Sequence, residues 1–238
     1  MHDPVNDLAG WTIAFDLDGT LIDTAPDLLG ALNVILVEQG MTPAPMTAVR
    51  QLVGHGLRGM LIRAYAMAGL PLGEDEIAQL RPRIVEVYRG RIAQESRPFP
   101  GCLAALAGLR ARGAALAVCT NKPEGLARLL LDQLEMTALF DAIVGGDTLP
   151  VQKPDPAPLR EAIAQAGGDI ARAILVGDAS PDTGAAKAAG VPCIVLSFGY
   201  NDLPSAELGG DVTIDHFDAL AGAVGDLVAS CRPAAESL

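Results

Sequence analysis

The stretch FDLDGTLIDT, residues 15–24, is the most informative part of this sequence. It follows the apolar run WTIAF, residues 11–15, which predicts a short buried strand that stops abruptly at Asp16 and Asp18. Side chains two positions apart on an extended segment point to the same side, so the two carboxylates would face one site. Because open α/β sheets bind ligands at the carboxyl ends of their strands, we expect a functional site here.

The paired carboxylates predict metal-assisted chemistry at this strand end. Two adjacent acids repel each other unless they share a cation or a proton, and a hard divalent cation such as Mg2+ prefers oxygen ligands. One carboxylate could then attack a phosphorus atom while the other moves protons at the leaving oxygen. Gly19 would allow the tight turn that brings both groups together. The alternative, an aspartate-rich turn that caps a helix, is disfavoured because two acids directly after an apolar strand are costly without a role.

Apolar runs that predict buried strands recur along the chain and alternate with helical patterns rich in Ala and Leu. This alternation predicts an α/β fold with a Rossmann-like, doubly wound parallel sheet covered by helices on both faces. The strand-like runs lie at residues 114–119, 142–144, 173–176 and 193–196.

Residues 24–93 interrupt this alternation. They contain helical patterns at residues 27–39, 46–52, 56–68 and 73–94 without a convincing strand, and Pro82 predicts a kink or a break in the last helix. A helical block inserted after the first strand indicates a cap on the α/β core. We therefore predict a core domain formed by residues 1–23 and 94–238 and an inserted α-helical cap domain formed by residues 24–93.

Composition excludes several classes of protein. The 238 residues carry a net charge of -12, which argues against nucleic acid or an anionic membrane as the main partner. Half of the residues are hydrophobic, which excludes a disordered chain. The sequence shows no secretory signal and no run of about 18 apolar residues that could span a membrane, so we expect a cytoplasmic protein. The four scattered cysteines include no C-x-x-C pair, which argues against zinc and a disulfide framework.

Three further segments place polar side chains after predicted strands. Thr120 and the backbone N–H groups that follow it could donate to phosphate oxygens, although such a threonine often only caps a helix. Lys153 stands in a proline-rich turn. Taken alone, such a lysine is usually a solvated surface charge. Asp178 and Asp182 follow the predicted strand at 173–176. The alternative to a functional site is a solvated loop, which is more plausible for Asp182 than for Asp178.

Together, these segments resemble the four sequence motifs of the haloacid dehalogenase superfamily, in its phosphatase form. The resemblance rests on order and spacing over the whole predicted core. The matching segments are DLDGT at residues 16–20, TNKP at 120–123, KPDP at 153–156 and GDASPD at 177–182.

This resemblance implies a role for each matching residue. Asp16 would be the nucleophile that becomes an aspartyl phosphate, and Asp18 the general acid and base. Mg2+ would be held by Asp16, Asp178 and the backbone carbonyl of Asp18. Residues expected to bind phosphate are Thr120, Asn121 and Lys153, and residues expected to support the metal site indirectly are Gly19, Thr20 and Asp182.

Other segments resemble the phosphoglycolate phosphatase group of this superfamily. They are TAPDL at residues 24–28, VGHGLRGML at 53–61 and FGY at 198–200. The resemblance implies a small phosphorylated acid, 2-phosphoglycolate, as substrate. Arg58 and Arg63 are the candidate cations for its carboxylate, because a planar guanidinium suits that geometry, and Arg58 is slightly favoured over Arg63. Two arginines on the surface are the alternative. The cap residues expected near the substrate are Gly54, His55, Gly56 and Arg58.

Two other functions share parts of this pattern. A sugar-phosphate phosphatase or phosphomutase on the same scaffold would keep the core residues and differ in its cap contacts. A phospho-acceptor signalling domain also uses acids, a threonine and a lysine on a doubly wound sheet. The spacing of Asp16 and Asp18 argues against signalling, because a second acid beside the phospho-acceptor promotes rapid turnover. The sequence indicates no oligomeric state.

Overall fold

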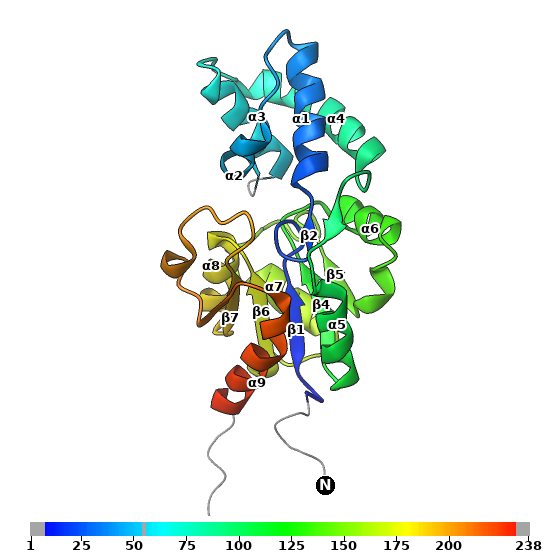
Figure 1. The fold of residues 1–238 in the computed structure, drawn as a ribbon, viewed down its shortest axis with the longest axis vertical. Helices are drawn as coiled ribbons and strands as arrows, with labels where there is room; N and C mark the ends of the chain where they lie inside the picture. The colour runs from blue at the N-terminus through cyan, green and yellow to red at the C-terminus, as the bar shows by residue number, and fades with distance from the viewer. Residues whose placement is uncertain (1–7, 54–55, 232–238) are drawn as a thin grey trace, which may run out of the picture.

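The centre of the molecule is a six-stranded sheet in which all neighbouring strands are parallel. The computed structural model describes residues 8–53 and 56–231. The strand order is β5-β4-β1-β6-β7-β8 (Figure 1). The chain begins at β1 in the middle of the sheet, runs through β4 to β5 at one edge, and then returns to β6 on the other side of β1. This order confirms the predicted doubly wound α/β core. The strands are β1 (Thr12–Phe15), β4 (Ala115–Cys119), β5 (Ala142–Val144), β6 (Ala173–Gly177), β7 (Cys193–Leu196) and β8 (Val212–Ile214).

The sequence of β1 explains its central place. All four of its residues are buried, and its three apolar residues alternate between the two apolar clusters that cover the sheet. Phe15 lies in one cluster and Ala14 in the other, as expected for a parallel strand buried on both faces. Phe15 also lies opposite Val118 in β4 and Val176 in β6, so these three strands end at the same level. This register places the residues that follow each strand side by side.

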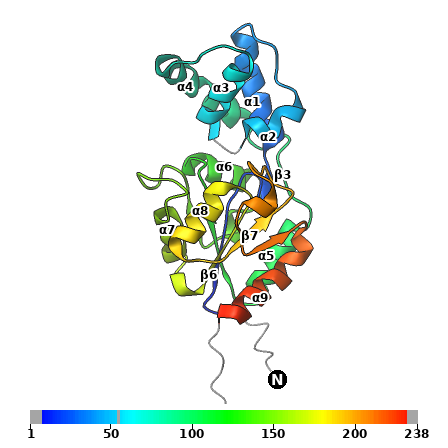
Figure 2. The same cartoon turned by 90° about the vertical axis from the view of Figure 1, so that its left-hand side faces the viewer.

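Helices cover both faces of the sheet. Figure 2 shows α7 and α8 on one side and α5 and α9 on the other. None of the helices in the described part of the chain is long and apolar enough to cross a membrane. The helices are α5 (Cys102–Ala111), α6 (Glu124–Gln133), α7 (Ala157–Gln165), α8 (Ser180–Ala189) and α9 (Leu220–Cys231), and short 3-10 turns lie at Met46–Ala48, Thr137–Leu139, Ile170–Arg172, Ser205–Glu207 and Phe217–Ala219.

A second group of helices stands over the carboxyl ends of the strands (Figures 1 and 2). The chain enters and leaves this group through β2 (Ile22–Asp23) and β3 (Arg97–Pro98), which pair antiparallel. We propose that the group is the predicted cap domain of residues 24–93. Its helices are α1 (Ala25–Glu38), α2 (Val49–Leu52), α3 (Gly56–Met67) and α4 (Glu74–Arg91).

The structure corrects the sequence analysis in two places. Helix α4 continues through Pro82 and is not split there, because it packs against α1 and α3 with Ile77, Ile84 and Tyr88 buried. This burial offsets the cost of an interior proline, about 3 kcal/mol. The strands β2, β3 and β8 were not predicted, because β2 and β3 have only two residues each and β8 is partly exposed, whereas the equally short β5 is apolar and fully buried.

Candidate active site

Three neighbouring strands deliver the central residues of the site. Asp16 follows β1, and its backbone N–H donates to the carbonyl of Val176 in β6 at 2.9 Å. Thr120 follows β4, and its N–H donates to the carbonyl of Val144 at 3.0 Å. Asp178 follows β6. Because the three strands end at one level, these side chains meet at the edge of the sheet where α/β proteins bind ligands.

Lys153 enters the site from the loop before α7. Its ammonium group donates to an oxygen of Asp16 at 2.8 Å, to one of Asp182 at 2.6 Å and to the carbonyl of Cys119 at 2.7 Å. Burial alone would lower the pKa of Lys153, but the charges of Asp16 and Asp182 raise it above its ordinary value. The lysine is therefore charged, and all three of its N–H donors are engaged.

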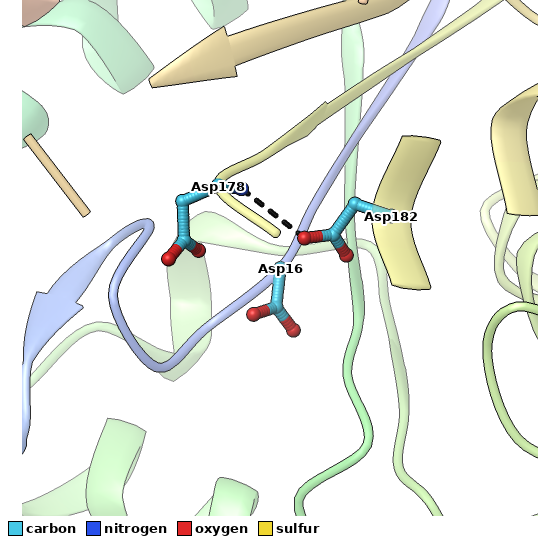
Figure 3. A group of neighbouring side chains, drawn as sticks. All are labelled: Asp16, Asp178 and Asp182. Atoms are coloured by element: carbon cyan, nitrogen blue, oxygen red, sulfur yellow. Dashed lines mark hydrogen bonds between the residues drawn. The ribbon is translucent and has the colours of Figure 1, made fainter. Parts of the chain in front are cut away.

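Asp178 and Asp182 are held by hydrogen bonds within the core. Asp178 accepts from the hydroxyl of Thr20 and from the backbone N–H of Tyr200, each at 2.6 Å. Asp182 lies in the first turn of α8 and accepts from the backbone N–H groups of Asp178 and Ala179, each at 3.1 Å (Figure 3). The start of a helix favours a negative side chain. Both carboxylates are thus fixed in place before any ligand binds.

These acids form a cluster that fits a metal ion. Asp16, Asp178 and Asp182 each offer a carboxylate oxygen, and these oxygens lie within 4.8 Å of one another (Figure 3). Burial and the negative charges of its neighbours raise the pKa of Asp178 well above its ordinary value, and burial also raises that of Asp182. Lys153 offsets only part of the charge. A hard divalent cation would relieve the remaining repulsion, and oxygen donors are the ligands that such a cation prefers.

Gly19 must be glycine for two reasons. Its φ of +86° lies in the left-handed region that side chains rarely adopt. A Cβ atom there would also stand 2.6 Å from a carboxylate oxygen of Asp178 and 2.7 Å from the ring of Tyr200. The turn therefore passes directly against the acid cluster, and Thr20, the next residue, donates to Asp178.

Asp18 has a partner that the sequence analysis did not predict. The ammonium group of Lys122 lies 2.9 and 3.0 Å from the two carboxylate oxygens of Asp18 and 2.6 Å from the hydroxyl of Tyr88. Burial alone would lower the pKa of Lys122, but Asp18 and Tyr88 raise it. The position of Lys122 in the TNKP motif was a usable signal, whereas Tyr88 comes from α4 and nothing in its local sequence points to the site.

The loop after β4 is held by hydrogen bonds of its own polar side chains. The hydroxyl of Thr120 accepts from the backbone N–H of Lys122 at 3.2 Å. The side chain of Asn121 donates to the carbonyl of Lys153 and accepts from its N–H, both at 3.0 Å. The side chain of Asn121 therefore fixes the backbone of Lys153, and its phosphate contact stays a prediction.

A cavity of about 70 Å³ lies between the acid cluster and the helices above it. Arg58 lies outside it, because its side chain is exposed and pairs with Glu74. Gly54 and His55 fall outside the described residues. The predicted residues that line the cavity are Asp16, Asp18, Gly56, Thr120, Asn121, Lys153, Asp178 and Asp182.

Comparison with known proteins assigns this arrangement to a family. Residues 13–196 match the family model described as haloacid dehalogenase-like hydrolase. The chain belongs to this family. The matched segment runs from Ile13 in β1 to the end of β7. It therefore includes every residue of the acid cluster and the two lysines of the site, Lys122 and Lys153.

Individual relatives of this hydrolase cover nearly its whole length. It is 46% identical over 227 residues to a phosphoglycolate phosphatase of Caulobacter vibrioides, an alignment that covers 95% of this chain and 96% of the relative. It resembles the crystal structure of a predicted phosphoglycolate phosphatase from Haemophilus somnus, with a TM-score of 0.82, 31% identity and coverage of 91% and 98%. CbbY from Rhodobacter sphaeroides, solved in complex with phosphate, gives a TM-score of 0.72, 26% identity and coverage of 88% and 95%.

Proposed function

We propose that this hydrolase is a Mg2+-dependent phosphatase that converts 2-phosphoglycolate to glycolate and phosphate through an aspartyl phosphate on Asp16. The observation that carries the proposal is the position of Asp16 in the acid cluster, with the ammonium group of Lys153 at 2.8 Å and Asp18 two residues further on. The name of the Caulobacter relative supports the substrate, and the phosphate bound to CbbY supports the chemistry.

The two halves of the reaction use the two aspartates of the DLD segment. In the first half, a carboxylate oxygen of Asp16 bonds to phosphorus, the ester bond to the glycolate oxygen breaks, and Asp18 gives a proton to that oxygen. In the second half, Asp18 accepts a proton from water. The water oxygen bonds to phosphorus, the bond to Asp16 breaks, and phosphate leaves.

Positive charge and hydrogen-bond donors around Asp16 stabilise the transferring group. Lys153 neutralises Asp16 and keeps it beside the site, and the Thr120 hydroxyl lies where it can donate to a phosphoryl oxygen. Asp16, Asp178 and the carbonyl of Asp18 would hold Mg2+, which when bound supplies positive charge that offsets the phosphoryl oxygens.

The wall of the cavity opposite the acid cluster favours a small substrate over a phosphosugar. Its side chains include Leu28, Val53, Leu57 and Met60, which cannot pair with sugar hydroxyls. A buried hydroxyl without a partner costs about 1–3 kcal/mol. The volume of about 70 Å³ corresponds to about five to seven water molecules, at roughly 10–15 Å³ each. A small charged metabolite also fits the cytoplasmic location predicted from the sequence.

A substrate screen tests this proposal. We expect kcat/KM for 2-phosphoglycolate to exceed that for glucose 6-phosphate and for other phosphosugars by at least about tenfold, the effect of one charge-assisted contact of roughly 1.5–3 kcal/mol. The measurement is initial-rate phosphate release in Mg2+ over a panel of phosphomonoesters. A phosphosugar at the top of the ranking would replace the proposed substrate and favour the sugar-phosphate alternative.

Asp178→Ala tests the metal site. The Mg2+ concentration that gives half-maximal rate should rise by at least about tenfold, because even indirect supporters of a metal site contribute a factor of about 10–100 in affinity. Asp215→Ala, on the exposed surface, is the matched control. An unchanged Mg2+ requirement would place the metal elsewhere.

A further inference from the structure

We propose that Lys122, supported by Tyr88, binds the carboxylate of the substrate and so selects a phosphorylated acid; this inference rests on the proposed function. Among the described residues that line the cavity, the cationic side chains are Lys122 and Lys153. Lys153 has its three donors engaged on the phosphoryl side of the site, with Asp16, Asp182 and the Cys119 carbonyl. Lys122 also makes three contacts, but they are with Asp18 and Tyr88 and not with the nucleophile. Lys122 is therefore the cation of this lining that lies toward the other end of the substrate.

The position of Lys122 relative to Asp18 matches the shape of a short phosphorylated acid. In the proposed mechanism, Asp18 gives its proton to the ester oxygen. The carboxylate carbon of 2-phosphoglycolate lies two bonds beyond that oxygen. An ammonium group that touches both oxygens of Asp18, at 2.9 and 3.0 Å, therefore lies beside the place where the substrate carboxylate must sit. The carboxylate would take over part of the contact that Lys122 makes with Asp18.

Tyr88 fixes Lys122 in this place. The tyrosine is fully buried on α4, its hydroxyl lies 2.6 Å from the ammonium nitrogen, and its ring centroid lies 4.5 Å from the same atom. The contact of a cation with an aromatic face is favourable in a dry site. The lysine on the core and the tyrosine on α4 thus form one recognition element across the cavity.

Charge in the site makes such a cation necessary. Four carboxylates, those of Asp16, Asp18, Asp178 and Asp182, line the cavity, and the protein carries a net charge of -12. A second anionic group on the substrate would be repelled unless a local cation met it. The apolar side chains Leu57 and Met60 on the opposite wall offer none. Arg58, the cation predicted for this role, is exposed and paired with Glu74.

Two substrates of similar length test the inference. 2-Phosphoglycolate carries a carboxylate where 2-hydroxyethyl phosphate carries a hydroxymethyl group. In Lys122→Met, we expect kcat/KM for 2-phosphoglycolate to fall by at least about tenfold more than kcat/KM for 2-hydroxyethyl phosphate, with the excess mainly in KM. Lys122→Arg, which keeps the charge, should restore part of the preference. Lys187→Met, which removes an exposed lysine on α8, is the control and should change neither substrate.

A second variant keeps the test decisive if Lys122→Met does not fold, as checked by thermal unfolding. Tyr88→Phe retains the ring and removes the hydroxyl, and it should raise KM several-fold for 2-phosphoglycolate alone. Equal losses on both substrates in these variants would overturn the assignment, because Lys122 would then act only by positioning Asp18. A selective loss in Arg58→Ala without one in Lys122→Met would also overturn it. A wild-type enzyme without a preference for 2-phosphoglycolate would reject the proposed function itself, and the role of Lys122 with it.

Discussion

Replacing Asp16 with asparagine is expected to lower kcat by roughly 10⁴-fold or more, since loss of a catalytic nucleophile typically has an effect of this size. The amide cannot attack phosphorus to form the acyl phosphate, while its size is that of the carboxylate. The side chain can still accept a hydrogen bond from Lys153. The substitution also removes one of three clustered acids. The free energy of unfolding of the metal-free protein should therefore stay unchanged or rise.

The measurement for Asp16→Asn combines single-turnover phosphate release with urea unfolding in EDTA. Asp18→Asn gives a useful contrast, because it keeps the nucleophile and removes the group that activates water. With p-nitrophenyl phosphate, whose leaving group needs no proton, Asp18→Asn should accumulate an enzyme heavier by one phosphoryl group. Near wild-type turnover in Asp16→Asn, with intact folding, would reject the covalent mechanism.

The core of the fold could be predicted because its strands are buried on both faces. The segment TIAF of β1 is buried throughout and apolar in its last three residues, and most of the other parallel strands are likewise buried and apolar. The edge strand Val212–Ile214 is partly exposed and only three residues long, so its sequence carries little signal. The continuity of α4 through Pro82 depends on packing against α1 and α3, which local propensity does not contain.

The meeting of three polar residues at the ends of the strands could be predicted for a related reason. Asp16, Thr120 and Asp178 each follow a strand directly, so their meeting is fixed by the register of β4, β1 and β6. Side-chain contacts between segments that are distant in the sequence could not be predicted in this way. The hydroxyl of Tyr200 donates to Asp23 at 2.6 Å and accepts from the N–H of Ala25 at 2.7 Å, and so connects the acid cluster with the start of α1.

The largest change in stability is expected for Lys153→Met. The side chain of Lys153 is 2% exposed and joins Asp16 to Asp182. Removing one partner of a buried ion pair leaves uncompensated charge and typically costs about 3–5 kcal/mol. We therefore expect a loss of about that size in the free energy of unfolding at neutral pH in EDTA. The variant should also lose at least about 10³-fold in kcat, because the phosphoryl group loses a direct cationic partner.

The pH dependence distinguishes this electrostatic loss from a loss of packing. Burial already raises the pKa of Asp182 in the wild type, against the opposing effect of Lys153, so the substitution should raise that pKa further. An acid whose pKa is raised by folding binds its proton more tightly in the folded state, so stability increases as the pH falls through the folded pKa. The deficit of Lys153→Met relative to the wild type should therefore shrink between pH 7.5 and pH 5.5.

The raised pKa of Lys153 has the opposite relation to pH and does not interfere with this comparison. A lysine whose pKa is raised by folding contributes its full stability below its unfolded value, and that contribution is lost only as the pH rises through the folded pKa. Both test conditions lie far below that range, so the wild type keeps its ion pairs in each. Lys187→Met, the exposed control, should match the wild type at both pH values. A deficit of equal size at pH 7.5 and pH 5.5 would mean that Lys153 stabilises the core by packing, and not by neutralising the acids on which the proposed chemistry depends.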